Sequence, residues 1–360
     1  MRYLDEFRNQ KSAQNLLRRI KSVSSGKINL MEVCGTHTVT ILRSGIKQLL
    51  EDKMNLISGP GCPVCVTSTY DLDKAIAIAR QDNVILTTFG DMTRVPGGDS
   101  SLEKERAQGS DIRVVYSAFD AVKLAVQAPD KIVVFLAIGF ETTAPTIASS
   151  VKEAARLGLK NFFIISLHKV VPPAMKALLD MGEVNLHGFI CPGHVSAIIG
   201  SRPYEFVTKD YGIPCVITGF EPLDVLQAIY MLIRQRADKK SLVEIQYTRG
   251  VPKPGNPVAL KLMDEVFEPC DANWRGIGVI PGSGLKLRER YQAFNIEQKL
   301  KINVPERGEP KGCSCGDILR GVKTPKQCVL FGKRCTPEDP VGPCMVSSEG
   351  TCAAYYKYYR

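Results

Sequence analysis

Short apolar runs alternate with longer amphipathic stretches between residues 28 and 235, and this alternation predicts strands that are each followed by a helix. Eight runs have the length and the β-branched composition of buried strands, and they are INLMEV, MNLIS, NVILTTF, IRVVY, KIVVFLAI, NFFIISL, HGFIC and IPCVIT. Helices are predicted after Thr38, after Ser68, and over residues 120–127, 142–157 and 223–234. Because strands that alternate with helices form parallel sheets, the chain is predicted to be an α/β protein.

Two similar parallel-sheet domains are predicted within this region. The segments VCGTHTVTI and IGFETTAPTI both place a Thr-rich helix start after a strand, although many α/β sequences share that pattern, so a duplication stays open. The predicted parts are an N-terminal helical segment 1–26, a first α/β domain 27–127, a second α/β domain 128–236 and a C-terminal iron–sulfur domain 237–360. In the last part, RGVPKPGNPVAL is typical of a linker, and WRGIGVIPGSGLKLRERY predicts a strand, a turn and a helix.

Composition and charge exclude several classes of protein. The chain has 360 residues, 44% of them hydrophobic, and none of its apolar runs approaches the ~18 residues that span a bilayer. The start MRYLDEFRNQK lacks the apolar segment of a signal peptide, so we expect a cytoplasmic protein without membrane contact. The net charge is +10, but the basic residues are scattered, so we expect no nucleic-acid partner. The surplus charge is interpreted mainly as a solvated surface, and docking of an acidic partner protein stays open.

Six of the twelve cysteines fall in the last 48 residues, at positions Cys313, Cys315, Cys328, Cys335, Cys344 and Cys352. Structural disulfides are rare in the cytoplasm, so this tail favours metal or redox chemistry over a disulfide knot. It has no pair of CxxC knuckles, which zinc sites prefer, and no C-x₂-C-x₂-C run of bacterial ferredoxins. Six thiols are two more than one [4Fe–4S] cluster needs, so four ligands and one redox dithiol form the simplest partition.

Reactive side chains follow the predicted strands, where open parallel sheets bind their ligands. Cys34 ends the first strand, and Cys62 and Cys65 form a CxxC pair in the loop GPGCPVC. Three thiols from two neighbouring loops suit a thiolate-preferring metal such as iron or zinc, with a position left open for chemistry. Because a helix is expected to start after this pair, its partial positive charge is predicted to favour the thiolates.

Other residues at the strand ends have two interpretations. Asp91, in TFGDMTRVPGG, suits proton transfer or a cap of a helix or turn. His194 follows Pro and Gly at a predicted helix start and is a better functional candidate, whereas Glu141 in GFETTAP can cap or bind. The remaining candidates are interpreted mainly as core residues or have no partner motif, and they are His37, Cys191, Cys215 and Cys270.

Seven motifs occur in order along nearly the whole chain: CGTHT, GPGCPVC, TFGDMTRVPG, AIGFETTAP, CPGHVS, ITGFEP and PVGPCMVSSEGTCAA. Together they resemble the signature blocks of the HypD family of hydrogenase maturation factors, and no block is missing. The resemblance implies an assembly scaffold, not a hydrolase, that acts with the chaperone HypC and the cyanide donor HypE. It also implies that the scaffold carries transient Fe(II) with CN and CO ligands while the Fe(CN)₂CO unit of [NiFe]-hydrogenase is built.

The resemblance further implies two related α/β domains and a third domain whose [4Fe–4S] cluster lies beside a disulfide, as in ferredoxin:thioredoxin reductase. The implied cluster ligands are Cys313, Cys328, Cys335 and Cys344. The implied dithiol next to the cluster is Cys315 with Cys352. Nascent iron would be held by Cys34, with Cys62 and Cys65 as ligands or as a redox pair. The positions that match other functional residues of the family are Asp91, His194 and Glu349.

A relay of electrons follows from these assignments as a hypothesis. Release of cyanide from a thiocyanate consumes two electrons, whereas a cluster passes one at a time. Transfer from the cluster through Cys315 and Cys352 to Cys62 and Cys65 would convert the delivery of single electrons into the delivery of an electron pair. The alternative function is a stand-alone iron–sulfur dithiol–disulfide oxidoreductase, which has no need of Cys34. No GxxxxGK[ST] loop is present, so nucleotide hydrolysis is not predicted.

Overall fold

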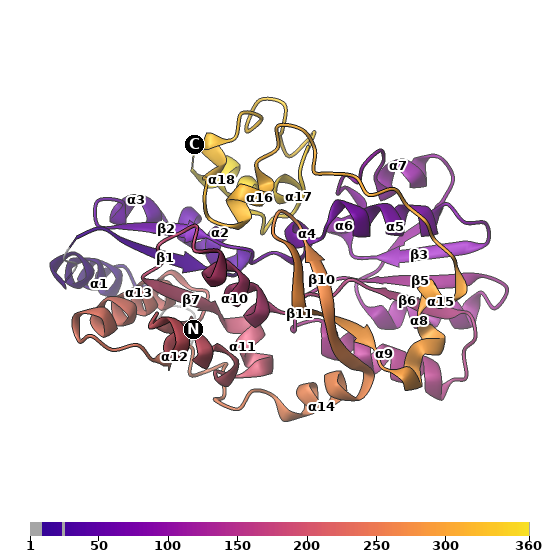
Figure 1. Ribbon diagram of the computed structural model, residues 1–360, viewed down its shortest axis with the longest axis horizontal. Helices are drawn as coiled ribbons and strands as arrows, with labels where there is room; N and C mark the ends of the chain where they lie inside the picture. The colour runs from indigo at the N-terminus through magenta and orange to yellow at the C-terminus, as the bar shows by residue number, and fades with distance from the viewer. Residues whose placement is uncertain (1–8, 24–25, 360) are drawn as a thin grey trace.

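The computed structural model describes residues 9–23 and 26–359, and it contains two parallel sheets, a long hairpin and a cysteine-rich tail (Figure 1). All eight predicted strands are present, which confirms the α/β class. Their bounds are β1 Ile28–Glu32, β2 Met54–Ser58, β3 Val84–Thr88, β4 Asp111–Val114, β5 Ile132–Ala137, β6 Phe162–Ser166, β7 Gly188–Pro192 and β8 Cys215–Thr218.

The two sheets divide the strands in a way that the sequence does not predict. The first sheet has the order β2-β1-β7-β8-β9, where β9 (Val243–Ile245) was not predicted, and the second has the order β4-β3-β5-β6. Neighbouring strands in both sheets run parallel. The chain leaves the first sheet after β2 and returns to it at β7. The predicted boundary at residues 127 and 128 therefore separates β4 from β5, which belong to one sheet.

Helices cover the sheets, and their starts follow local capping chemistry. Ser68 Oγ accepts a hydrogen bond from Asp71 N at 3.1 Å at the start of α5, and Ser117 and Asp120 form a capping box at the start of α8. The helices that correspond to the predicted ones are α2 Gly35–Arg43, α5 Thr69–Ala79, α8 Ala118–Gln127, α9 Ala144–Arg156 and α13 Pro222–Ala237. The N-terminal segment contains α1 Gln10–Val23, and residues 1–8 lie outside the described part.

The remaining helices are shorter or were not predicted. They are α3 Ile46–Leu50, α4 Pro63–Val66, α6 Gly90–Thr93, α7 Leu102–Ala107, α10 Val171–Met181, α11 Gly193–Ile199, α12 Glu205–Tyr211, α14 Pro257–Val266, α15 Ile296–Lys299, α16 Cys315–Leu319, α17 Pro343–Val346 and α18 Thr351–Tyr358. None of the described helices has both the length and the apolar character needed to cross a membrane.

A two-stranded antiparallel hairpin corrects the prediction for residues 274–291. Strand β10 (Phe267–Trp274) pairs with β11 (Gly278–Leu287), and only a 3₁₀ turn, Glu289–Phe294, follows. The predicted helix is absent there because GVIPGSGL carries glycines and a proline, which oppose a helix but fit an irregular hairpin. Figure 1 shows the hairpin between the two sheets, with its tip next to α4 and below the tail.

The tail has no sheet among its described residues and packs on the rest of the molecule through short helices. Its helix α18 lies against α2, where Leu42, Ala354 and Tyr355 form a small apolar cluster. At the hairpin tip, Gly276 lies so close to Gly316 of α16 that an added Cβ would be 2.1 Å from Gly316 Cα. The tail is therefore held by α2 on one side and by the hairpin tip on the other.

Two glycine substitutions test the contact at the hairpin tip. Gly276 has φ +69° and Gly278 has φ +95°, but an added Cβ at Gly278 meets nothing within 4 Å. Alanine at either position carries backbone strain, and only Gly276→Ala also clashes with the tail. We expect Gly276→Ala to lower the free energy of unfolding by about 2 kcal/mol more than Gly278→Ala, as measured by urea denaturation. Equal losses would mean that this contact does not hold the tail.

Candidate functional site

Loops that follow β1 and β2 meet at the carboxyl edge of the first sheet, as expected for a parallel sheet. Cys34 occupies the N-cap of α2, and Cys62 occupies the N-cap of α4. Gly35 N donates a hydrogen bond to Gly61 O at 2.9 Å, and an added Cβ on Gly61 would lie 2.2 Å from Cys34 N. The backbones on either side of Cys34 and Cys62 thus lie in direct contact.

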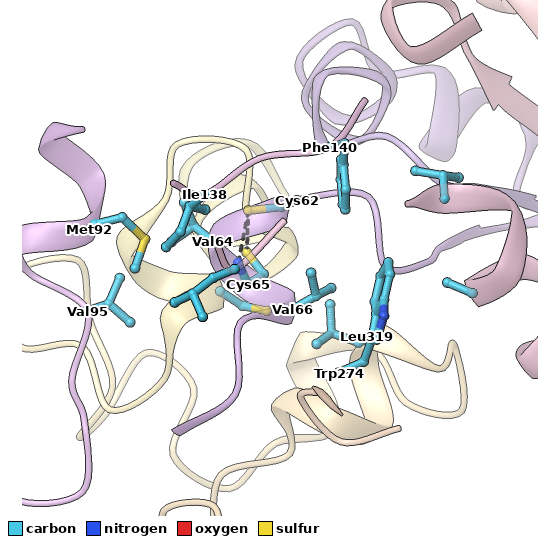
Figure 2. Packing of buried hydrophobic residues seen from close by; sticks show 14 of the residues in the cluster. Cys62, Val64, Cys65, Val66, Met92, Val95, Ile138, Phe140, Trp274 and Leu319 are labelled. Carbon is cyan, nitrogen blue, oxygen red and sulfur yellow. Dashed lines mark hydrogen bonds between the residues drawn. The ribbon is translucent and has the colours of Figure 1, made fainter. Parts of the chain in front are cut away.

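The CxxC pair is buried and faces the tail. The sulfurs of Cys62 and Cys65 are 2.7 Å apart, and Figure 2 shows them among apolar side chains that include Val64, Val66 and Phe140. On its other side, Cys65 Sγ lies 3.9 Å from Pro343 O, and the Cys344 thiol is one of the neighbours that act on the pKa of Cys65. Helix α17 of the tail therefore packs directly on the CxxC helix α4.

Sulfur contacts continue from Cys344 into the tail. Cys344 Sγ lies 2.9 Å from Cys315 Sγ, and the Cys352 thiol is one of the neighbours that raise the pKa of Cys344. None of the four sulfur-bearing residues Cys62, Cys65, Cys344 and Cys315 is more than 4% exposed. We call these four residues the thiol row. They link a loop of the α/β core to the tail without an intervening solvent layer.

The other four tail thiols lie around one end of the thiol row. The neighbouring Cys315 thiol, followed by burial, raises the pKa of Cys313. Burial, followed by the Cys352 and Cys313 thiols, raises the pKa of Cys335. Val341 N donates to Cys335 Sγ at 3.4 Å, and Cys328 Sγ lies 3.8 Å from Gly312 O. Within the described part of the chain, no three His, Cys, Asp or Glu side chains converge on a position for a single metal ion. Cys34, Cys62 and Cys65 do not converge in that way either.

The prediction that the helix start after the CxxC pair favours thiolates is wrong for Cys65, and Cys34 is not a thiolate either. Burial, followed by the charge of Glu349, raises the pKa of Cys34 to about 12, and burial raises the pKa of Cys65 well above its usual value. Loss of hydration disfavours the charged form more than a four-residue helix can favour it. These thiols are protonated at neutral pH, so a metal that binds them must displace protons.

A cavity of about 440 Å³ opens beside Cys34 and is lined by Gly61, Pro63, Phe140, His194 and Glu349, among others. Thr36 Oγ1 donates to Glu349 Oε1 at 2.7 Å. The same two residues also line a neighbouring cavity of about 530 Å³, and Asp91 belongs to that second cavity. The structure thus brings His194 and Glu349 to the Cys34 cavity, whereas Asp91 lies beyond the Thr36–Glu349 pair.

Phe220 is a residue of this site that the sequence did not single out. Its ring stacks between the imidazoles of His194 and His37, with centroid distances of 3.9 Å and 4.8 Å. His37 Nε2 donates to Gly219 O at 3.0 Å in a fully buried position, which agrees with its interpretation as a core residue. The sequence contains a signal for Phe220, because the tripeptide Gly-Phe-Glu occurs twice, each time after a predicted strand. Its other copy supplies Phe140 to the cavity wall.

The other strand-end candidates serve packing or capping. Glu141 accepts a hydrogen bond from Val171 N at 2.9 Å at the start of α10, and burial raises its pKa to about 7. Cys191 and Cys215 lie on the neighbouring strands β7 and β8 in the buried centre of the first sheet. Cys270 lies on β10 and is half-buried.

Comparison with known proteins identifies relatives of the whole chain. Residues 11–359 match the model of HypD, described as the "Hydrogenase formation hypA family". The hydrogenase maturation factor HypD of Azotobacter vinelandii is 48% identical over 369 residues, which cover 100% of this chain and 97% of that protein. HypD of Cupriavidus necator is 45% identical over 370 residues, with 100% and 98% covered. The hydrogenase expression/formation protein HupD of Azotobacter chroococcum mcd 1 is 48% identical over 369 residues, with 100% and 97% covered.

Alkylation of Cys34 tests the electrostatics of its cavity. Glu349→Gln keeps an oxygen for Thr36 but removes a negative charge that raises the pKa of Cys34. We expect iodoacetamide to modify Cys34 up to about tenfold faster in this variant at pH 8, as followed by mass spectrometry of the Cys34 peptide. Asp91→Asn is the matched control and should leave the rate unchanged. Equal acceleration by both variants, or none in Glu349→Gln, would contradict this assignment.

Proposed function

The chain belongs to the HypD family of hydrogenase maturation factors, and we propose that it is the scaffold on which the Fe(CN)₂CO unit of [NiFe]-hydrogenase is assembled. Its partners would be a HypC-type chaperone and a HypE-type cyanide donor. The observation that carries this proposal is the thiol row, which leads from the tail to Cys62, next to the cavity of Cys34. Electrons can thus be delivered where iron and its ligands are brought together.

Iron, the cargo of this scaffold, would be held at Cys34, next to the CxxC pair. The cavity beside Cys34 is lined by Gly61 and Pro63, the neighbours of Cys62 on both sides, whereas Cys65 faces Cys344. Its volume of about 440 Å³ accommodates an iron ion with diatomic ligands. Binding replaces the thiol proton of Cys34, because the thiolate is the form that ligates iron. His194 lines the same cavity and can take up that proton.

The sulfur contacts favour a revised division of the tail thiols. Cys315 and Cys344 are 2.9 Å apart, so we propose them as the redox dithiol, with Cys352 in the role that the resemblance gives to Cys344. The [4Fe–4S] ligands would then be Cys313, Cys328, Cys335 and Cys352.

The tail offers this set the surroundings that a cluster needs. A backbone N–H donates to Cys335 Sγ, and an added Cβ on Gly342 would lie 2.9 Å from Cys313 Sγ, so glycine leaves room at that sulfur. Each of the four thiolates of a [4Fe–4S] cluster binds its own iron atom, so the four sulfurs do not converge on one ion. When bound, the cluster supplies single electrons.

Exchange along the thiol row would move electrons in pairs. The Cys344 thiolate attacks Cys65 of a Cys62–Cys65 disulfide, so that a Cys344–Cys65 bond forms and Cys62 leaves as a thiol after protonation. Cys315 then attacks Cys344, which forms the Cys315–Cys344 disulfide and releases Cys65. Two electrons and two protons have then passed to Cys62 and Cys65.

The reduced CxxC pair can complete the transfer of cyanide from the donor. Its two thiols reduce a partner-bound thiocyanate to a thiol and hydrogen cyanide, and they return to the Cys62–Cys65 disulfide. One S–C bond breaks and one S–S bond forms, so the two electrons and two protons balance. The released cyanide is taken up by the iron beside Cys34.

A stand-alone disulfide reductase of other proteins is less well supported. Such an enzyme needs a nucleophilic thiol that a partner's disulfide can reach. The four members of the thiol row are at most 4% exposed, whereas the cavity beside Cys34 gives a small group access to one end. Burial therefore favours transfer within the chain.

Infrared spectroscopy of the chain purified with its partners tests the scaffold function. We expect bands of iron-bound CO and CN⁻ in the natural protein, and their loss in Cys34→Ala. Cys270→Ala, a half-buried thiol on β10, is the matched control and should keep the bands. No bands in the natural protein, or bands that survive Cys34→Ala, would refute the proposal.

Iron analysis separates the two divisions of the tail thiols. After anaerobic purification we expect about four iron atoms per chain in Cys344→Ala, as in the natural protein, and substantially fewer in Cys352→Ala. This result follows if Cys352 ligates the cluster and Cys344 belongs to the redox pair. The opposite pattern would restore Cys344 as a ligand.

A further inference from the structure

Strand β2 is an edge of the first sheet, and a groove runs along it. Its neighbour in the sheet is β1, and no other backbone segment in the described part of the chain hydrogen bonds with residues 54–58. A cavity of about 400 Å³ is lined by all five of these residues, and also by Gly321 and Pro325 of the tail. Because successive side chains of a strand point to opposite faces, a cavity that touches five in a row lies along the edge of the strand.

Alternate backbone groups of β2 face this groove. Lys53 O, directly before the strand, accepts a hydrogen bond from β1 at 3.3 Å, and Gly59 N, directly after it, donates to β1 at 2.8 Å. Neighbouring residues of a strand turn their backbone groups to opposite sides, so those of Met54, Leu56 and Ser58 face away from β1. Such an edge offers main-chain hydrogen bonds to an added strand.

Lys47, which comes from α3, occupies one of these backbone groups. Its Nζ donates to Leu56 O, the position that the N–H of an added strand would take. Burial lowers the pKa of Lys47 to about 8, and no carboxylate of the described residues forms an ion pair with it. An added strand with a carboxylate satisfies both groups, because its N–H replaces the ammonium at Leu56 O and its carboxylate pairs with the released ammonium.

The other charged residues of the groove also favour an acidic occupant. Lys27, next to β1, and Lys323, in the tail, add positive charge, and Glu51 is the one carboxylate among the described lining residues. Lys323 already pairs with Asp317 at 2.7 Å, and Glu51 accepts a hydrogen bond from Tyr359 at 3.4 Å. Pairing of two β2 edges from two copies of this chain would bring like charges together, which opposes a symmetric dimer here.

We propose that the groove along β2 docks an extended acidic segment of a partner protein, which adds a strand to the first sheet. Main-chain hydrogen bonds to Met54, Leu56 and Ser58 would give affinity, and carboxylates that pair with Lys47 and Lys27 would give specificity. The segment would lie between the first sheet and the tail. This inference is independent of the proposed electron relay.

Hydrogen exchange of the full chain tests the docking. The probe is a short synthetic peptide of alternating glutamate and valine, with blocked ends. We expect it to slow exchange of the amides in Met54–Ser58, as measured by mass spectrometry. Strand β9 (Val243–Ile245), at the opposite edge of the same sheet, is the matched control and should exchange as before.

Fluorescence anisotropy of the labelled peptide separates the two parts of the recognition. We expect Lys47→Gln to weaken binding about tenfold, because a charge-assisted hydrogen bond is lost. Lys123→Gln, which removes an exposed lysine of α8, should leave binding unchanged. A peptide with N-methylated backbone amides keeps every carboxylate but cannot donate to the strand edge, so it should bind at least about tenfold more weakly to the natural protein.

Three results would overturn the inference. Equal binding of the N-methylated peptide would mean that the lysines attract any acidic peptide without formation of a strand. Equal protection of β9, or none of Met54–Ser58, would mean that the groove is not the docking site. Protection of Met54–Ser58 that rises with protein concentration in the absence of peptide would assign this edge to a second copy of the chain.

Discussion

The packing of α17 on α4 is the contact on which the site depends. It brings Cys344, from the end of the chain, to Cys65, from the second βα loop, and excludes water from both. Without that contact the CxxC pair would be an ordinary strand-end dithiol, and the tail would be a separate cluster of thiols.

Burial at this contact decides how the thiols can react. Loss of hydration raises the pKa of Cys65 and of Cys34, so neither is a free thiolate at neutral pH. A protonated, enclosed thiol is protected from oxidants and alkylating agents in solution. It still reacts with a sulfur that the fold has placed beside it, or with a metal that displaces its proton. The arrangement of the chain, and not an activated thiolate, thus determines which partner each thiol reacts with.

Local patterns were sufficient to predict the strands but not their assembly. Each β-branched run carries its own signal, so β1 to β8 were all found, whereas the return of the chain to the first sheet at β7 has no local signature. In the same way, cysteine identity and loop position singled out the thiols. The 2.9 Å contact of Cys315 with Cys344 depends on how α16 and α17 pack. Thiolate character was mispredicted because a helix start is visible in a sequence, while burial is not.

Charge at this site is confined to the two ends of the thiol row. At one end, Glu349 and His194 line the Cys34 cavity, and at the other, Arg275 pairs with Glu309 and its charge acts on Cys315. Between them, Cys65 and Cys344 have no charged partner among the sulfur contacts. Exchange that carries two electrons together with two protons leaves this middle section neutral, so its low polarity does not oppose transfer. A single electron would leave a net charge there, which burial disfavours. The distribution of charge therefore favours pairwise transfer, which the reduction of a thiocyanate requires.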